Sequence, residues 1–177
     1  MIDEIREYQR KIFAKHNFTY KRYFYDKVNF DAKLIGIVGA RGVGKTTFLI
    51  QHLKEPDLSF SQKLYISADT INIPSLFEVA EVFSKENGKV LIIDEIHKYQ
   101  NFELELKKIY DILDLKVIFS GSSALQIDNS KADLSRRAIV HHFEGLSFRE
   151  FIELNNNISL PAYSLEYILA NHIDIAY

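Results

Sequence analysis

Short runs of hydrophobic residues recur along the chain and predict the strands of a buried sheet. Residues 34–38 and 90–93 are the clearest, because neither run alternates with polar residues. Strands that are covered on both faces have this pattern, as in parallel sheets. We expect strands at residues 34–38, 63–67, 90–93, 116–120 and 138–143.

Stretches with helical periodicity separate most of these runs. Two of them begin with the spacing of a capping box, in which Ser75 pairs with Glu78 and Ser147 pairs with Glu150. Alternation of strands and helices favours a doubly wound α/β layer fold. The expected helices cover residues 46–54, 75–87, 102–115, 148–154 and 165–176.

Glycine is concentrated directly after the first predicted strand, where four of the seven glycines fall between Gly36 and Gly44. Residues 39–46 match the pattern G-x-x-x-x-G-K-[ST] at every fixed position. Glycines let a backbone wrap closely around phosphates, and the following helix N-terminus favours anions. Lys45 supplies a positive charge for the β- and γ-phosphates, and the Thr46 hydroxyl is a ligand for Mg²⁺. The predicted nucleotide-binding residues are Gly39, Ala40, Arg41, Gly42, Val43, Gly44, Lys45, Thr46 and Thr47, with Arg41 in a local role at the rim of the loop.

Two carboxylates, Asp94 and Glu95, follow the strand predicted at residues 90–93. Open α/β sheets place their ligands at this carboxyl edge. We expect Asp94 to belong to the Mg²⁺ shell and Glu95 to orient the water that attacks the γ-phosphate. The alternative, two solvated acids at a strand end, is weaker because a phosphate loop precedes them. GTPases normally carry D-x-x-G here, and the chain has Ile96 and His97 after the acids, which excludes that class.

Ser120 and a pair of arginines complete the candidate residues. Ser120 ends a predicted strand, where it either contacts the γ-phosphate or the attacking water, or belongs to a polar strand exit; the sequence weighs these equally. Arg136 and Arg137 precede the last predicted strand. Adjacent arginines are usually solvated, but in this context one of them is a candidate arginine finger that reaches the nucleotide of a neighbouring subunit in a homo-oligomer.

Composition narrows the possible environment and partners of the chain. The 177 residues are 47% hydrophobic with a net charge of −2, which argues against a globally basic nucleic-acid binder. Cysteine is absent, so disulfides, Cys-ligated metal centres and thiol nucleophiles are excluded. The longest apolar run near the start covers residues 34–40 and is far shorter than the roughly 20 residues that span a bilayer. Carboxylates lie at the N-terminus where a signal peptide would carry positive charge, so a signal peptide is not expected. We expect a cytoplasmic protein without membrane attachment.

Residues 8–25 combine five basic with seven aromatic side chains and contain no acid. Basic and aromatic residues together can neutralise phosphates and stack bases, which would indicate DNA binding. The alternative is an amphipathic helix followed by an extended segment that packs its aromatic side chains against the sheet edge or near the adenine of the nucleotide. We favour the packing alternative, because aromatic side chains more often fill cores.

Together these motifs resemble an AAA-type ATPase family of bacteria and archaea. The resemblance rests on residues 34–47, 92–99, 119–125, 132–137 and 145–151. It implies a three-layer α/β/α P-loop NTPase fold with a parallel five-stranded sheet in the order 5-1-4-3-2. It also implies that Ser120 is the sensor residue, that Arg137 is the first candidate for the finger, and that Arg136 is the second. Members usually continue through a helical lid, so the expected parts are an N-terminal arm (1–30), an ATP-binding core (31–154) and the start of a truncated lid (155–177).

The sequence therefore predicts ATP binding and Mg²⁺-dependent ATP hydrolysis, with Lys45, Thr46, Asp94 and Glu95 as the central residues. An alternative is a switch module that binds ATP or ADP and that could also associate with DNA. Such a module would hydrolyse little ATP without a lid and an arginine from a partner. A small-molecule kinase would need an arginine-rich lid and an acceptor pocket, and neither is visible in the sequence.

Overall fold

The computed structural model describes residues 1–70, 73–122, 134–159 and 161–175. Two compact units divide the chain, Met1–Gly145 and Leu146–Tyr177. The sequence places boundaries after residues 30 and 154, whereas the compact units meet after Gly145 and the N-terminal segment belongs to the first unit. Parts of two segments that carry the family resemblance fall within residues 123–133, outside the described residues.

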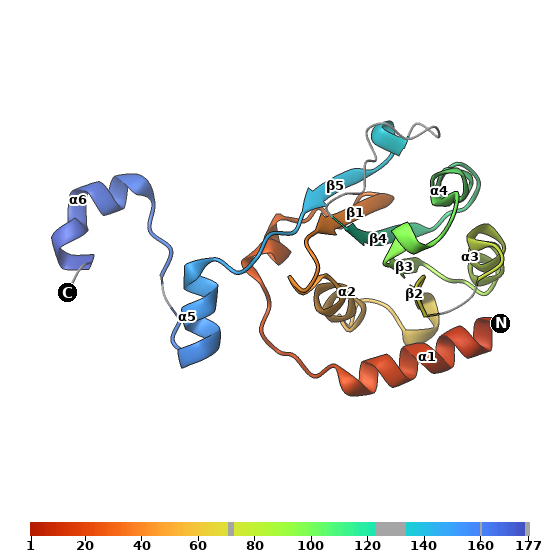
Figure 1. Ribbon diagram of the computed structural model, residues 1–177, viewed down its shortest axis with the longest axis horizontal. Coiled ribbons are helices and arrows are strands. Elements are labelled where there is room, and N and C mark those ends of the chain that lie inside the picture. The colour runs from red at the N-terminus through yellow and green to blue at the C-terminus, as the bar shows by residue number, and fades with distance from the viewer. Residues whose placement is uncertain (71–72, 123–133, 160, 176–177) are drawn as a thin grey trace. The chain divides into compact units, whose positions relative to one another are not determined.

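The first unit is built around a five-stranded sheet in the order β2-β3-β4-β1-β5, in which each paired neighbour is parallel (Figure 1). This order is the predicted one, read from the other edge. The strands are β1 (Leu34–Gly39), β2 (Lys63–Ser67), β3 (Val90–Asp94), β4 (Lys116–Ser122) and β5 (Ile139–His142).

Helices cover both faces of this sheet (Figure 1). α2 (Lys45–Leu53) packs on one face, and α3 (Leu76–Lys85) and α4 (Phe102–Ile112) pack on the other. α1 (Ile2–Lys15) lies along the edge strand β2. The first unit is therefore a three-layer α/β/α sandwich, as predicted. Short 3₁₀ helices add η1 (Tyr23–Lys27), η2 (Phe60–Gln62), η3 (Ile96–Lys98) and η4 (Leu134–Arg136).

The central strand β3 explains why the hydrophobic runs do not alternate with polar residues. Leu91 and Ile93 join the apolar cluster under α3 and α4, while Ile92 joins the cluster under α2. All three side chains are fully buried. Successive side chains of a strand point to opposite faces, so a strand covered on both faces needs an apolar residue at every position.

The ends of the elements follow local hydrogen bonding. α3 begins after Ser75, whose hydroxyl accepts a hydrogen bond from the Glu78 N–H at 3.2 Å. The second unit begins its helix α5 (Phe148–Asn156) with the predicted capping box of Ser147 and Glu150. The predicted capping box is therefore complete at α5, and α3 has the predicted N-cap hydrogen bond.

The second unit contains α5 and α6 (Leu165–Ile175), and α6 is interrupted by a non-helical backbone at Asn171. Across the part of the chain that the structure describes, no helix has both the length and the apolar character needed to cross a membrane.

Candidate functional site

The loop that joins β1 to α2 is shaped by its glycines. A Cβ atom on Gly39 would lie 2.2 Å from the carbonyl oxygen of Phe143, so only glycine fits where β1 ends beside β5. Gly44 has φ +102°, a left-handed conformation that favours glycine, and it turns the chain into α2 at Lys45. The loop therefore feeds directly into a helix N-terminus, as an anion-binding loop must.

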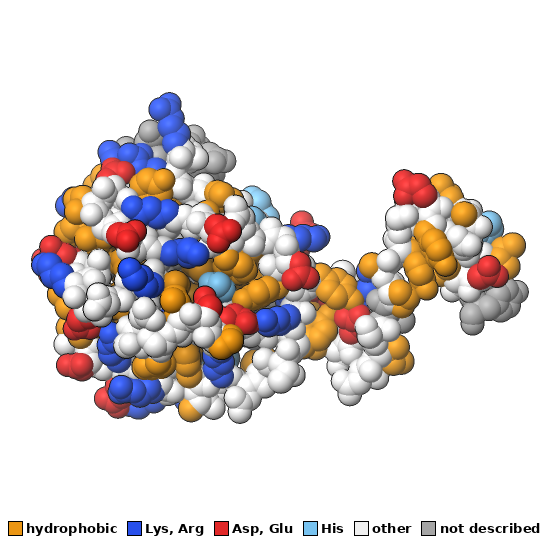
Figure 2. Space-filling model, turned by 180° about the vertical axis from the view of Figure 1, so that it is seen from behind, with side chains coloured by type: hydrophobic (Ala, Val, Ile, Leu, Met, Phe, Trp, Pro, Cys, Tyr) orange, Lys and Arg blue, Asp and Glu red, His pale blue; other side chains and the backbone are white. Residues whose placement is uncertain are grey.

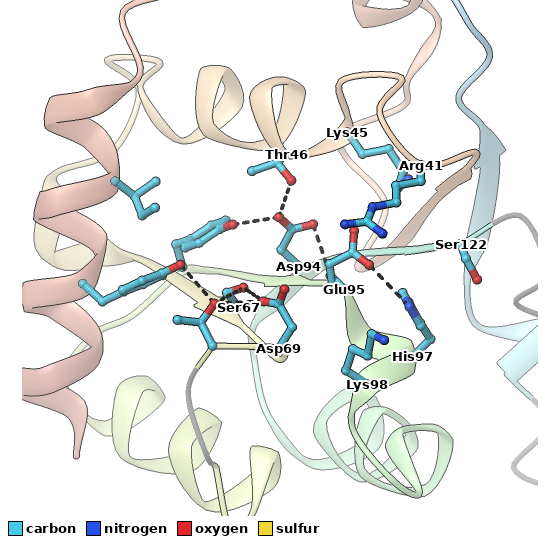
Figure 3. Close-up of a pocket in the computed structure, with 14 residues that line it drawn as sticks. Arg41, Lys45, Thr46, Ser67, Asp69, Asp94, Glu95, His97, Lys98 and Ser122 are labelled. Carbon is cyan, nitrogen blue, oxygen red and sulfur yellow. Dashed lines mark hydrogen bonds and ion pairs between the residues drawn. The ribbon is translucent and has the colours of Figure 1, made fainter.

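Lys45 is held inside this loop. Only 6% of the surface of this residue is exposed. Its Nζ donates hydrogen bonds to the carbonyl oxygens of Gly39 at 2.9 Å and Ala40 at 2.8 Å. The ammonium group is thus fixed at the first residues of the loop, next to the pocket that Figure 3 shows.

The carboxylate of Asp94, at the end of β3, accepts hydrogen bonds at both oxygens. Oδ2 accepts from the Thr46 hydroxyl at 2.6 Å and from the Tyr65 hydroxyl at 2.7 Å (Figure 3). Oδ1 accepts from the Ser120 hydroxyl and from the N–H of Glu95. Asp94 is only 2% exposed, so these donors replace the water that a carboxylate otherwise needs. Burial, reinforced by the charge of Asp94, raises the pKa of Tyr65 and keeps its hydroxyl a donor.

Glu95 turns the chain out of the sheet. Its φ of +55° is left-handed, which is uncommon for a residue with a side chain and typical of strained functional positions. Its N–H donates to the Ser120 hydroxyl at 3.0 Å, and its carboxylate lies 3.4 Å from Nε2 of His97 (Figure 3). The Glu95 side chain is 30% exposed, so it can reach water in the pocket.

These residues surround a pocket of about 630 Å³ at the carboxyl edge of the sheet. The sequence-predicted residues Arg41, Lys45, Thr46, Asp94 and Glu95 all line it. Further lining residues come from α1, from β2 and the residues after it, from the β3–η3 segment and from the end of β4: Tyr8, Ile12, Tyr65, Ser67, Asp69, Thr70, His97, Lys98 and Ser122.

Several lining residues were not anticipated from the sequence. Ser67 is the last residue of β2, and Asp69 and Thr70 follow it; the Ser67 hydroxyl donates a hydrogen bond to the Asp69 carboxylate. That hydrogen bond lowers the pKa of Asp69. The rule that identified Asp94, polar residues after a buried strand, would have found this group as well.

Ser120 lies beside the pocket, not at its wall. It is fully buried and hydrogen-bonds Asp94 and the Glu95 backbone, so its contacts are with the acidic strand end. β4 continues two residues beyond its predicted end at Ser120, and Ser122 is the serine that lines the pocket.

Arg136 and Arg137 lie at the opposite end of the strands from the pocket. They precede β5, which runs parallel to β1, so they lie near the amino ends of the strands while the phosphate loop follows a carboxyl end. Arg137 pairs with both carboxylate oxygens of Asp111, at 3.0 and 3.2 Å. A contact between either arginine and the nucleotide of a neighbouring subunit stays a prediction.

The N-terminal segment packs its aromatic side chains against the sheet. The ring of Phe24 lies 4.7 Å from that of Phe143 and 5.5 Å from that of Phe48. Arg22 donates to the carbonyl oxygens of Val43 at 3.1 Å and Gly145 at 2.8 Å. On the face of the first unit seen in Figure 2, acidic and basic side chains are mixed. These contacts support the packing alternative for the segment.

The donor set fits Mg²⁺ bound together with a nucleotide. Among the described residues, no group of three or more His, Cys, Asp and Glu could hold a metal ion by itself. Mg²⁺ does not require such a group, because it keeps several waters and binds through one or two protein oxygens plus substrate phosphates. The Thr46 hydroxyl and the Asp94 carboxylate, which touch each other, supply such oxygens.

Three comparisons with known proteins found similar sequences or structures. Uncharacterized protein MJ1637 of Methanocaldococcus jannaschii is 33% identical over 183 aligned positions, which cover 92% of this chain and 38% of that protein. The chain thus spans little more than a third of the length of this relative. A structure of C. elegans PCH-2 aligns with 80% of this chain and 41% of its own, at 17% identity and a TM-score of 0.44. Residues 31–152 match the AAA domain family, and this segment contains the phosphate loop, Asp94 and Glu95. The chain therefore belongs to the AAA domain family of nucleotide-binding P-loop ATPases.

Proposed function

We propose that this domain binds ATP with Mg²⁺ and hydrolyses it to ADP and phosphate. The observation that carries the proposal is the 2.6 Å hydrogen bond between the Thr46 hydroxyl and the Asp94 carboxylate. It joins the first turn of the helix after the phosphate loop to the end of β3, so the two parts of an ATP site meet at one point.

Each residue then has a separate task. The loop backbone and Lys45 bind the β- and γ-phosphates, and Thr46 and Asp94 hold the Mg²⁺ shell. When bound, Mg²⁺ neutralises charge that develops on the phosphate oxygens. Glu95 orients the attacking water, because its carboxylate lines the pocket and its backbone is fixed by Ser120. Phosphoryl transfer depends mainly on positioning and charge stabilisation, and these residues supply both.

Nucleotide binding is tested with Lys45→Ala. The buried Lys45 ammonium is the cation that we assign to the β- and γ-phosphates, so its removal should abolish ATP binding in a fluorescent-nucleotide titration. Lys85→Ala is the matched control, since that side chain is 70% exposed on α3 and should bind ATP like the wild type. Unchanged ATP affinity in Lys45→Ala would refute the site.

Hydrolysis is tested with Glu95→Gln, which keeps the size of the side chain and removes its charge. We expect ATP binding to persist while phosphate release falls by at least about a hundredfold, the lower range for loss of a positioned base. Turnover at the wild-type rate would remove Glu95 from the mechanism.

A second candidate function, an ATP or ADP switch with slow hydrolysis, is favoured by one contact. The Glu95 carboxylate lies 3.4 Å from Nε2 of His97 in η3, so it has a neighbour there that can compete with the attacking water. A switch predicts that ATP remains intact in a single-turnover experiment and that His97→Ala speeds hydrolysis. Equal rates in His97→Ala and wild type would count against the switch.

A further inference from the structure

Arg41 is a cation of the pocket that the proposed mechanism does not yet use. It lies in the phosphate loop, its side chain is exposed, and it lines the pocket together with Lys45 and Glu95. Figure 3 shows its guanidinium on the side of the pocket where Asp94 and Glu95 meet, with no hydrogen bond or ion pair drawn to another pocket side chain. An exposed arginine can reorient toward a phosphate without first losing a partner among those residues.

The other cations are less suited to stabilise charge at the γ-phosphate. Lys45 already donates to two loop carbonyls, and its task is to bind the phosphates. Arg137 is paired with Asp111 at the opposite edge of the sheet. Lys98 lines the pocket from η3, but an ammonium group presents a point charge, whereas a guanidinium presents a planar fork that matches two phosphate oxygens.

We propose that Arg41 acts as an arginine finger within its own chain, stabilising the transition state of ATP hydrolysis. This inference rests on the proposed function. In that step the water oxygen forms a bond to the γ-phosphorus while the bond from this phosphorus to the bridging oxygen breaks. The electron pair of the broken bond stays on ADP, and the proton that water loses passes through Glu95 to solvent. Arg41 donates hydrogen bonds to the oxygens that gain charge, and it needs no second subunit to do so.

The first experiment compares Arg41→Gln with Arg10→Gln, a matched loss of an exposed arginine, on α1. We expect Arg41→Gln to keep ATP affinity within about threefold and to lose about 10³-fold or more in kcat, the lower range for an arginine finger. Aluminium fluoride mimics the transferring phosphoryl group, so the wild type should bind ADP more tightly when aluminium fluoride is present. Arg41→Gln should lose this gain in ADP affinity. Arg10→Gln should match the wild type. A kcat within about threefold of wild type in Arg41→Gln overturns the proposal.

A mixing experiment separates action within a chain from action between chains. Arg41→Gln retains the nucleotide site, and Lys45→Ala retains the arginine. If Arg41 serves a neighbouring chain, a mixture of the two variants regains activity, which overturns the proposal. If Arg41 serves its own chain, the mixture stays inactive and wild-type activity per chain is independent of protein concentration.

Two further outcomes distinguish this inference from the proposed function. Absence of hydrolysis in the wild type would refute the proposed function, and the aluminium fluoride measurement would still decide the role of Arg41. Loss of turnover in Arg137→Ala or Lys98→Gln, with full turnover in Arg41→Gln, would assign the catalytic cation elsewhere and overturn the inference.

Discussion

His52 should make the stability of the first unit depend on pH. It lies in α2, with its ring stacked on that of Phe30 at a centroid distance of 4.0 Å and an interplanar angle of 7°. Its Nδ1 lies 3.1 Å from the Tyr25 hydroxyl. Burial lowers the pKa of His52 from 6.5 to about 4, although the charge of Asp57 acts in the opposite direction.

The sign of the effect follows from proton binding. Between the folded pKa of about 4 and the unfolded pKa of 6.5, the unfolded chain binds a proton at His52 that the folded chain does not. Acid therefore favours unfolding in this window, and stability rises with pH through it. From about pH 7.5 to about pH 5, linkage gives a loss of about 2 kcal/mol in the free energy of unfolding. A protein of this size loses about 4–8 °C in Tm for that change.

Thermal or urea unfolding of wild type and His52→Asn at both pH values measures this contribution. Asparagine keeps a polar group near the Tyr25 hydroxyl but does not titrate, so the variant should lack about 2 kcal/mol of the wild-type pH dependence. Comparing how the free energy of unfolding changes with pH in the two proteins removes the effect of the mutation on overall stability. Equal pH dependence in the two proteins would refute the reasoning.

Three substitutions test other contacts of the fold and the site. Tyr65→Phe removes a donor to a buried carboxylate and should lower the free energy of unfolding by about 1.5–3 kcal/mol, measured by urea unfolding. Gly39→Ala forces a Cβ against the Phe143 carbonyl and should cost about 3 kcal/mol or more and weaken ATP binding, while Gly145→Ala, which meets nothing within 4 Å, should match wild type in both assays. Gln9→Leu removes the partner of the Tyr65 N–H and of the Lys63 carbonyl in β2. We expect the free energy of unfolding to fall by about 1–3 kcal/mol, seen as a lower Tm, and the Tyr65 amide hydrogen to exchange faster. Unchanged stability in any of them would show that the contact contributes little.

The strands and the phosphate loop could be predicted because local chemistry fixes them. A sheet covered on both faces requires the apolar runs of β1 and β3, and a loop that wraps phosphates requires the residues from Gly39 to Thr46. Asp94 could be assigned to the pocket because it follows a buried apolar run, and open α/β sheets place their ligands at the carboxyl ends of their strands.

Other parts of the site depend on contacts between distant segments, which the sequence does not display. Tyr65 reaches Asp94 only because β2 lies beside β3, 29 residues later in the chain. Gln9 is fully buried because its amide pairs with the edge of β2, whereas its sequence context is an ordinary helix. The sequence placed Ser120 at the end of the strand, whereas β4 ends at Ser122, which lines the pocket. The ends of strands can be predicted from sequence only to within a residue or two.

The crowded environment of Asp94 has a consequence for the Mg²⁺ site that we propose. Its two oxygens accept hydrogen bonds from three side chains and one backbone amide, so the carboxylate has one orientation before any ion arrives. The conformational entropy of this ligand is lost when the chain folds, not when it meets its substrate. Stability and affinity are therefore linked through one side chain, and any substitution that frees Asp94 to rotate should weaken binding even where every phosphate contact is intact.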